Sequence, residues 1–290
     1  MPPDIGALIE SRVQRPQGIA EAAARRRKPA SYFGEHGKLM IIAADHPARG
    51  ALRAGGDALA MANRAELLDR LCTALDRPGV NGVLGTPDIL EDLLLLGVLD
   101  DKVVIGSMNR GGLAGTSFEI DDRFTAYDAD SIAASGFAGG KMLLRIDPDD
   151  AGTVATLQAC GRAVSDLAEH RLMAMVEPFI SHRVDGRVRN ELTAEAMIRA
   201  MTVAAGLGTT SAYTWLKVPV VRDMERVMAA TTLPALILGG EVSADADAAY
   251  TQWSKALDLP TVQGLVIGRS LLYPPGGDVA GAVDRAVSLL

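Results

Sequence analysis

The chain has 290 residues, of which 48% are hydrophobic, and it carries a formal net charge of -7. This length allows one large hydrophobic core, and the acidic balance argues against nucleic acid as a main partner. The N-terminus has no apolar signal core, and no stretch reaches the ~18 apolar residues that a membrane span requires. We therefore expect a cytoplasmic protein with no membrane partner.

The first segment, residues 1–37, predicts one or two helices that lie outside the main domain. The one basic run, Arg25 to Lys28, is interpreted as the solvated end of a helix, where basic side chains complement the C-terminal dipole. We expect this N-terminal helical extension to cap the base of the domain or to join subunits, and we expect a homo-oligomer.

Residues 38–290 form the main domain, in which short apolar runs alternate with amphipathic segments of helical spacing. Eight runs predict buried strands: 38–45, 79–85, 102–108, 139–147, 171–179, 213–220, 233–240 and 262–268. Strands that alternate with helices imply a parallel sheet, and eight such units in ~250 residues match a (β/α)8 TIM barrel of the α/β class. A doubly wound open sheet is the alternative, but no Gly-x-Gly-x-x-Gly motif follows the first strand.

Three consecutive predicted strands carry charged residues: Lys141, Glu177 and Lys217. Such side chains are almost never fully buried unless they are paired or functional. If all three point inward, they share one cavity, and both a like charge and desolvation lower the pKa of a lysine. A neutral amine is the nucleophile of Schiff-base chemistry, and a carboxylate beside it can move protons. A buried ion pair with a structural role is the alternative, although such pairs often stabilise no better than apolar packing.

The last two predicted strands end in glycine. Gly239 and Gly240 follow one strand, and Gly268 and Arg269 follow the next. Barrels frequently bind phosphate here, because glycine lets the backbone N–H groups approach the ligand and an arginine adds a charge-assisted contact. Ser243 can add a hydroxyl. The alternative is that the glycines only permit tight turns between strand and helix.

Six segments carry a family resemblance, in order across residues 37–273: GKLMIIAADHPARG, GGKMLLRIDPDD, MVEPF, WLKVPV, LILGGEVS and GLVIGRSLLY. With these segments the chain resembles the class I (Schiff-base) aldolases of the deoxyribose-phosphate and non-animal fructose-bisphosphate aldolase superfamily. The likeness is closest to the tagatose-bisphosphate aldolase-like branch. It implies a lyase that cleaves or forms a C–C bond in a phosphorylated ketose or deoxy-keto sugar acid, in carbohydrate or inositol catabolism, with no cofactor.

The resemblance also implies roles for single residues. Lys217 matches the Schiff-base lysine, while Glu177 and Lys141 match acid/base and substrate-orienting groups. Asp45 matches an aspartate near the reacting carbon. The phosphate-binding positions matched by the resemblance are Gly239, Gly240, Gly268 and Arg269.

The loop at 109–124 follows the third predicted strand, and its glycines suggest mobility. We expect it to help select the substrate through Arg110, Ser117 or Arg123. An ordinary connection between strand and helix is the alternative.

Two other functions stay open. A metal-dependent aldolase or isomerase on the same barrel would need several histidine and carboxylate ligands at strand ends. Of the four histidines in the chain, only His46 and His182 are expected near that face, and we predict no metal site. A non-catalytic sugar-phosphate-binding barrel would lack a nucleophile or an acid, whereas Lys141, Glu177 and Lys217 are all present.

Overall fold

The structure is a computed structural model, and it describes residues 3–33, 37–242 and 245–290. Eight parallel strands form a ring that closes where β4 pairs with β5. The barrel strands are β1 (Leu39–Ala43), β2 (Gly82–Gly85), β3 (Val103–Ser107), β4 (Gly139–Ile146), β5 (Met173–Val184), β7 (Thr214–Val218), β8 (Ala235–Leu238) and β9 (Val262–Ile267). The prediction of a (β/α)8 barrel is confirmed. Seven of the eight predicted runs contain one of these strands, and β5 begins inside the run 171–179 but extends beyond it.

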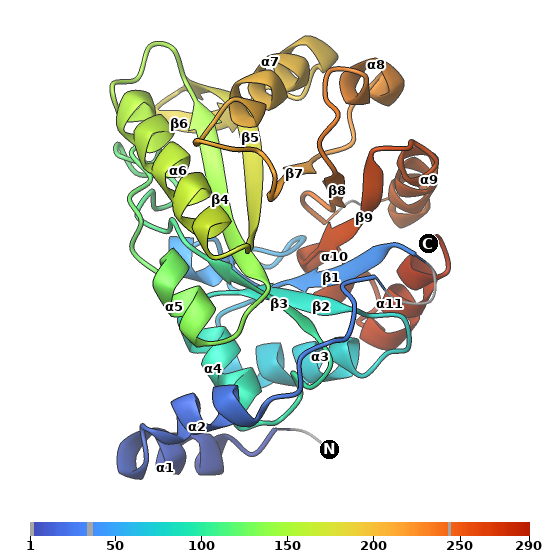
Figure 1. The fold of residues 1–290 in the computed structure, drawn as a ribbon. Helices are drawn as coiled ribbons and strands as arrows, with labels where there is room; N and C mark the ends of the chain where they lie inside the picture. Colours follow the sequence, from blue (N-terminus) through green and yellow to red (C-terminus); the bar gives the residue numbers. More distant parts are fainter. Residues whose placement is uncertain (1–2, 34–36, 243–244) are drawn as a thin grey trace.

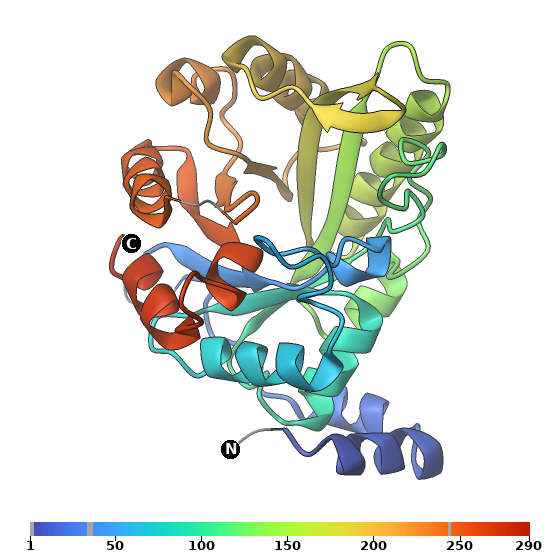
Figure 2. The ribbon, with the colours of Figure 1, turned by 180° about the vertical axis from the view of Figure 1, so that it is seen from behind.

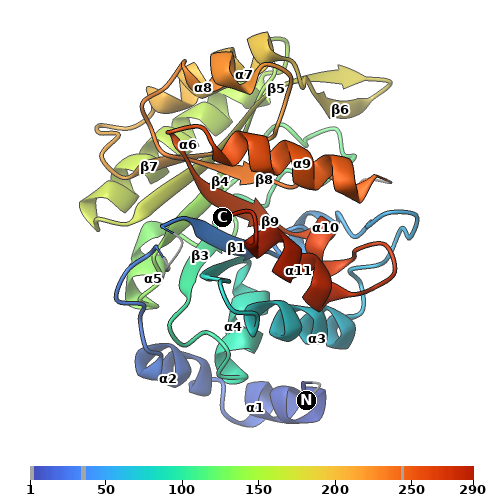
Figure 3. The ribbon, with the colours of Figure 1, turned by 90° about the vertical axis from the view of Figure 1, so that its right-hand side faces the viewer.

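Helices surround the barrel (Figure 1). They are α3 (Arg64–Leu75), α4 (Pro87–Leu95), α5 (Ala129–Ala134), α6 (Gly152–Glu169), α7 (Ala194–Ala205), α8 (Met224–Met228), α9 (Ala246–Leu257), α10 (Arg269–Leu272) and α11 (Val279–Val287), with a 3-10 turn at Pro47–Arg49. Side-chain oxygens begin several of them, since Asn63 caps α3 and Thr193 caps α7 by accepting backbone N–H bonds. Figure 3 shows α9, α10 and α11 beside β9. Within the described residues, no helix is both long and apolar enough to cross a membrane.

The alternation of side chains along each strand divides the core in two. On β1, Leu39 and Ile41 belong to the cluster inside the barrel, whereas Met40 and Ile42 pack against the surrounding helices. Every residue of β1 is buried, because a parallel strand inside a ring of helices is covered on both faces.

One hairpin was not predicted. β5 continues past residue 179 to Val184, and the chain then returns as β6 (Arg187–Asn190), which pairs antiparallel with β5. Asp185 and Gly186 form the turn with φ of 50° and 73°, as a type I′ hairpin requires. Figure 2 shows this hairpin in yellow at the upper end of the barrel.

The N-terminal extension forms α1 (Ile5–Gln14) and α2 (Gly18–Arg25), which lie beside α4 (Figure 1). Arg12 binds the α4 carboxylates of Glu91 and Asp92 at 3.0 and 2.8 Å. Further along, the ring of Phe33 lies 6.1 Å from that of Trp215 at the start of β7. The division of the chain into two parts at residue 37 stays a prediction.

The interpretation of the basic run as fully solvated is wrong for Arg26. Arg25, Arg27 and Lys28 are exposed, but Arg26 is buried. Its guanidinium donates hydrogen bonds to the carbonyls of Lys102 and Gly136 at 3.0 and 2.7 Å. A sequence run does not reveal that one member of it meets free carbonyls at the base of the barrel.

Candidate active site

A cavity of about 460 Å³ opens at the carboxyl ends of the barrel strands. Barrel enzymes carry their catalytic groups at this end. All four predicted catalytic side chains line it: Asp45 after β1, Lys141 on β4, Glu177 on β5 and Lys217 on β7. The structure therefore brings these four residues together.

Strand periodicity explains why these side chains point inward. Residues two apart on a strand share a face, and Met173 and Met175 of β5 belong to the apolar cluster inside the barrel. Glu177 comes next on that face. On β7, Trp215 packs against the same cluster, and Lys217 follows it. The barrel interior is apolar towards its base and charged towards the cavity.

The four side chains form a continuous series of ion pairs. The Nζ of Lys217 lies 2.9 Å from Oε1 of Glu177, whose Oε2 pairs with Lys141. The Nζ of Lys141 also lies 3.2 Å from Oδ2 of Asp45. All four are buried, and the most exposed of them, Glu177, has 8% of its surface exposed. Glu177 thus links the two lysines.

Asp45 is held by groups from the next strands. Ser107 at the end of β3 donates its hydroxyl to Oδ2 at 3.2 Å, and Nη1 of Arg110 lies 3.1 Å from the same oxygen. Burial alone raises the pKa of Asp45, but Lys141 and Arg110 reverse this effect and hold that pKa well below its usual value. Asp45 is therefore ionised at neutral pH.

For both Glu177 and Lys141, burial and the neighbouring charges shift the pKa in opposite directions. Burial raises the pKa of Glu177, but the opposing effect of Lys141 and Lys217 is larger and lowers this pKa to about 2. Burial lowers the pKa of Lys141, and although Asp45 and Glu177 oppose this, the result is about 8. Glu177 therefore stays ionised at neutral pH, whereas Lys141 can lose its proton near neutrality.

The glycine turns lie at the same mouth. Gly239, Gly240, Gly268 and Arg269 all line the cavity. Arg269 is weakly held, because its Nη2 lies 3.5 Å from the carbonyl of Gly240 and its buried Nε has no partner among the described residues. Ser243 lies outside the described residues.

Close packing also explains why glycine occupies these positions. A Cβ at Gly268 would overlap the carbonyl oxygen of Ala43, and one at Gly239 would lie 2.5 Å from Ile267 Cγ2. Gly240 has a φ of 69°, which L residues rarely adopt. Close packing and turn geometry therefore explain the glycines without a ligand, and the phosphate role stays a prediction.

The loop at 109–124 contributes differently from what its sequence suggests. Of the three residues expected to reach the substrate, only Arg110 lines the cavity. Ser117 is exposed, and Arg123 is exposed and pairs with Asp121 at 2.5 Å. The loop is also fixed, since Arg49 pairs with Asp122 and bonds the carbonyl of Asn109 at 2.7 Å.

Sequence reasoning assigned no role to several cavity residues. Arg49, Arg145 and Arg189 line the cavity together with Glu119 and Glu241. Of these residues, Arg145 was the easiest to infer from the sequence. It lies two residues after Leu143 and four after Lys141, so all three side chains share the inward face of β4 and line the cavity. Arg49 and Arg189 lie in a turn and a hairpin whose path depends on the folded chain.

The charge of the cavity differs from that of the chain. Although the protein carries a formal charge of -7, seven basic side chains and four carboxylates line the cavity. The basic residues are Arg49, Arg110, Lys141, Arg145, Arg189, Lys217 and Arg269. This excess of positive charge favours an anionic ligand.

The histidines do not gather at the site. His46 lines the cavity, and burial lowers its pKa to about 3, so it stays neutral. His182 is exposed on the β5–β6 hairpin, and His170 pairs with Asp130 at 2.8 Å at the end of α6. His36 lies outside the described residues. Across residues 3–33, 37–242 and 245–290, no three His, Cys, Asp or Glu side chains converge in a way that could hold a metal ion.

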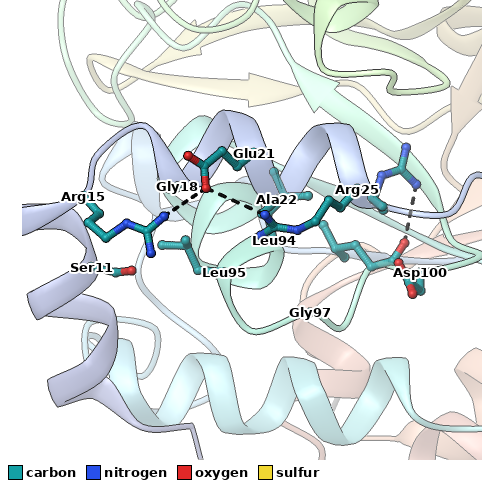
Figure 4. A pocket seen from close by; sticks show the side chains of 12 residues that line it. Ser11, Arg15, Gly18, Glu21, Ala22, Arg25, Leu94, Leu95, Gly97 and Asp100 are labelled. Atoms are coloured by element: carbon teal, nitrogen blue, oxygen red, sulfur yellow. Dashed lines mark hydrogen bonds and ion pairs between the residues drawn. The ribbon is translucent and has the colours of Figure 1, made fainter.

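A second cavity lies between the N-terminal helices and α4 (Figure 4). Arg15 and Arg25 both face Glu21, at 3.1 and 3.7 Å. The single carboxylate of Glu21 therefore balances one of these two positive charges. None of the predicted catalytic or binding residues lines this cavity, which favours the cavity in the barrel mouth as the functional site.

The fold is that of the class I aldolases. An archaeal fructose 1,6-bisphosphate aldolase matches with a TM-score of 0.66 and 20% identity, over 93% of this chain and 98% of that one. A second archaeal structure, whose catalytic lysine is covalently bound to the carbinolamine intermediate, matches with a TM-score of 0.65 and 20% identity, over 93% and 97%. This likeness shows the fold alone, and the tagatose-bisphosphate branch stays a prediction.

The chain belongs to the Cgl0159-like family, whose sequence profile matches residues 37–287. It is 55% identical to Cgl0159 from Corynebacterium glutamicum, with a TM-score of 0.95 over 98% of this chain and 95% of that one. No curated protein matched the sequence.

Proposed function

We propose that the protein is a class I aldolase, in which Lys217 forms a Schiff base with the carbonyl of a phosphorylated ketose or deoxy-keto sugar acid. The observation that carries this proposal is the buried series Lys217–Glu177–Lys141–Asp45 at the mouth of the barrel. An ion pair serves stability poorly at this depth, whereas a buried lysine close to a second ammonium group suits amine chemistry.

The first half of the reaction builds the imine. Lys217 first releases its ammonium proton to solvent, and its amine then attacks the substrate carbonyl and forms a carbinolamine. The carbinolamine hydroxyl then takes a proton and leaves as water, which gives a protonated imine. Lys141 is the better proton donor, because an acid with a pKa near the working pH transfers protons most efficiently, and the pKa of Lys141 is about 8 whereas that of Glu177 is about 2.

The second half breaks the C–C bond. A base removes the proton from the hydroxyl two carbons from the imine carbon, and that oxygen becomes the carbonyl of the released aldehyde. The bonding electrons pass to the imine and leave an enamine, which is then protonated at carbon. Water hydrolyses the resulting imine and frees Lys217. Glu177 and Asp45 are the ionised carboxylates in reach of this step.

The phosphate supplies binding energy away from the reacting carbons. The turns at Gly239–Gly240 and Gly268 offer backbone N–H groups, and Arg269 adds a charge. Interactions of this kind align the substrate, and such alignment accounts for a large part of many rate enhancements.

Borohydride trapping tests the proposal. The protein is incubated with phosphorylated ketoses and borohydride, and the adduct is located by mass spectrometry. We expect one adduct on Lys217, which is lost in Lys217→Ala and kept in the matched variant Lys255→Ala, whose lysine lies on the outer helix α9. An adduct on Lys141, or none with any substrate, would overturn the assignment.

Two outcomes would favour other functions. Activity that chelators abolish would indicate a metal-dependent aldolase or isomerase. Binding of ketose phosphates without cleavage would indicate a non-catalytic barrel.

A further inference from the structure

The β5–β6 hairpin extends one wall of the active-site cavity. β5 has twelve residues, whereas the other barrel strands have four to eight. Its pairing with β4 ends at Ile180, and its pairing with β6 begins at Ser181. The hairpin therefore begins where the barrel wall ends, and Figure 2 shows it beyond the strand ends.

Contacts at its base hold the hairpin in one position. Arg183 donates to Asp150 Oδ2 at 2.9 Å and to the carbonyl of Ser117 at 2.6 Å. Ser181 donates its hydroxyl to Asn190 at 2.9 Å across the two strands. These bonds tie the hairpin to the loops that follow β3 and β4, so its side chains are presented at fixed points of the cavity wall.

Arg189 on β6 lines this cavity and is exposed. Among the described residues the side chain of Arg189 makes neither an ion pair nor a hydrogen bond, unlike that of Arg145, which pairs with Glu119 on the same side. Two buried nitrogens nearby, Nε of Arg145 and Nη2 of Arg110, also have no hydrogen-bond partner among the described residues. This part of the wall therefore carries unused N–H donors and one unpaired positive charge.

Strand order places this group across the cavity from Arg269. In the closed ring of eight strands, β4 is four strands away from β9, and β5 is three strands away from it. Arg269 follows β9, whereas Arg145 ends β4 and Arg189 lies on the extension of β5. The reactive series from Asp45 to Lys217 lines the same cavity as both of these positively charged groups.

We propose that the β5–β6 hairpin is the specificity element of this site, and that Arg189, with Arg145, binds a second anionic group of the substrate. This inference rests on the proposed aldolase function. It names a substrate class, a chain whose carbonyl lies between two oxyanions, of which one meets Arg269 and the other, a carboxylate or a phosphate, meets Arg189. A sugar phosphate with a single anionic group leaves Arg189 unused.

Binding of probes without a carbonyl tests this inference apart from the chemistry. The probes are hexitol 6-phosphate, hexitol 1,6-bisphosphate and a hexonate 6-phosphate, and titration calorimetry measures each affinity. Wild-type protein is expected to bind both doubly anionic probes at least about tenfold more tightly than the monophosphate, since a hydrogen bond to a charged group is worth that much. The stronger of the two identifies the second anion as phosphate or carboxylate.

Arg189→Gln is the variant, and Arg187→Gln is its matched control. Both arginines are exposed on the same face of β6, but Arg187 does not line the cavity. We expect Arg189→Gln to lose the advantage of the doubly anionic probes and to keep the affinity for the monophosphate, while Arg187→Gln binds like wild type. Equal affinities of Arg189→Gln and wild type for every probe would overturn the inference. Since no probe forms an imine, failed borohydride trapping would count against the proposed function alone.

Discussion

At the scale of single residues, the site consists of charges that keep one another ionised. Glu177 contacts two ammonium groups, at Lys217 and Lys141, and the latter also contacts Asp45. Removing one member leaves another as an uncompensated buried charge, which costs far more than the loss of a surface pair. Activity and stability are therefore linked at these positions.

Replacement of Glu177 separates proton transfer from imine formation. We expect Glu177→Gln to lower kcat by ~10²–10⁴-fold, the usual contribution of a general acid–base group, while borohydride still traps an adduct on Lys217. Steady-state kinetics and mass spectrometry provide the two readouts. Glu225→Gln, on the exposed face of α8, serves as control. Loss of the adduct together with activity would contradict this division of roles.

The pKa of Lys141 predicts how activity depends on pH. Because this pKa is about 8, Lys141 is mostly charged at pH 7 and mostly neutral at pH 9. We expect kcat/KM to fall above pH 8, as the proposed proton donor is lost. A profile of kcat/KM from pH 6 to 10 measures this. A profile that is flat between pH 7 and 9 would exclude Lys141 as an essential acid.

The pKa of Glu177 predicts acid sensitivity of the fold. Its folded value of about 2 lies below the usual 4.5, so its contribution to the free energy of unfolding is complete above pH 4.5 and is lost as the pH falls towards 2. That difference corresponds to a loss on the order of 3 kcal/mol. Urea denaturation between pH 7 and 2.5 should show this decline. An unfolding free energy that is constant below pH 4.5 would show that Glu177 is not held by the two lysines.

The charged residues of the strands could be found from sequence because they interrupt apolar runs. Lys141, Glu177 and Lys217 occupy positions where burial is expected, so a partner or a function must explain them. Arg49 and Arg189 give no such signal, because an arginine in a polar turn is ordinary. Their place in the cavity follows from how the 3-10 turn and the hairpin fold over the barrel mouth.

At the scale of secondary-structure elements, the hairpin at β6 could have been recognised. Asp185-Gly186 is a strong signal for a two-residue hairpin turn, and Asp185 lies six residues beyond the end of the predicted strand at 171–179. The apolar character that predicts the strand at 171–179 extends no further than Ile180. Beyond the barrel rim a strand is no longer covered on both faces, so polar residues such as His182 and Arg183 enter it.

Substitutions at the two glycine turns can distinguish the cost of a steric clash from the cost of an unfavourable backbone conformation. Gly268→Ala puts a Cβ against the carbonyl of Ala43, where β9 pairs with β1, whereas a Cβ at Gly240 meets nothing within 4 Å. We expect Gly240→Ala to cost about 1–2 kcal/mol from its left-handed backbone alone, and Gly268→Ala to cost more. Denaturant titration of both variants measures the difference. Equal losses would show that the turn after β9 relaxes freely.

At the scale of the whole molecule, the N-terminal extension is joined to the barrel by buried polar contacts. Arg26 bridges the segment after α2 to the carbonyls of Lys102 and Gly136, which precede β3 and β4. Contacts at this end of the barrel are expected to serve stability, because the proposed active site lies at the opposite end. The extension should therefore affect unfolding without affecting the cavity.

Arg26→Met tests this separation. It removes the buried donors and leaves the carbonyls of Lys102 and Gly136 without them, which costs about 1–3 kcal/mol for an unsatisfied buried group. Arg27→Met is the matched control, because Arg27 is exposed and pairs only with Asp100 and Asp101 at the surface, where ion pairs contribute little.

We expect Arg26→Met to lower the free energy of unfolding and Arg27→Met to leave it nearly unchanged, with kcat/KM kept in both. Thermal and urea denaturation give the first readout and the aldolase assay the second. If Arg26→Met reduced kcat/KM while the fold remained intact, the base of the barrel would be coupled to the cavity through the strands, and its role would not be stability alone.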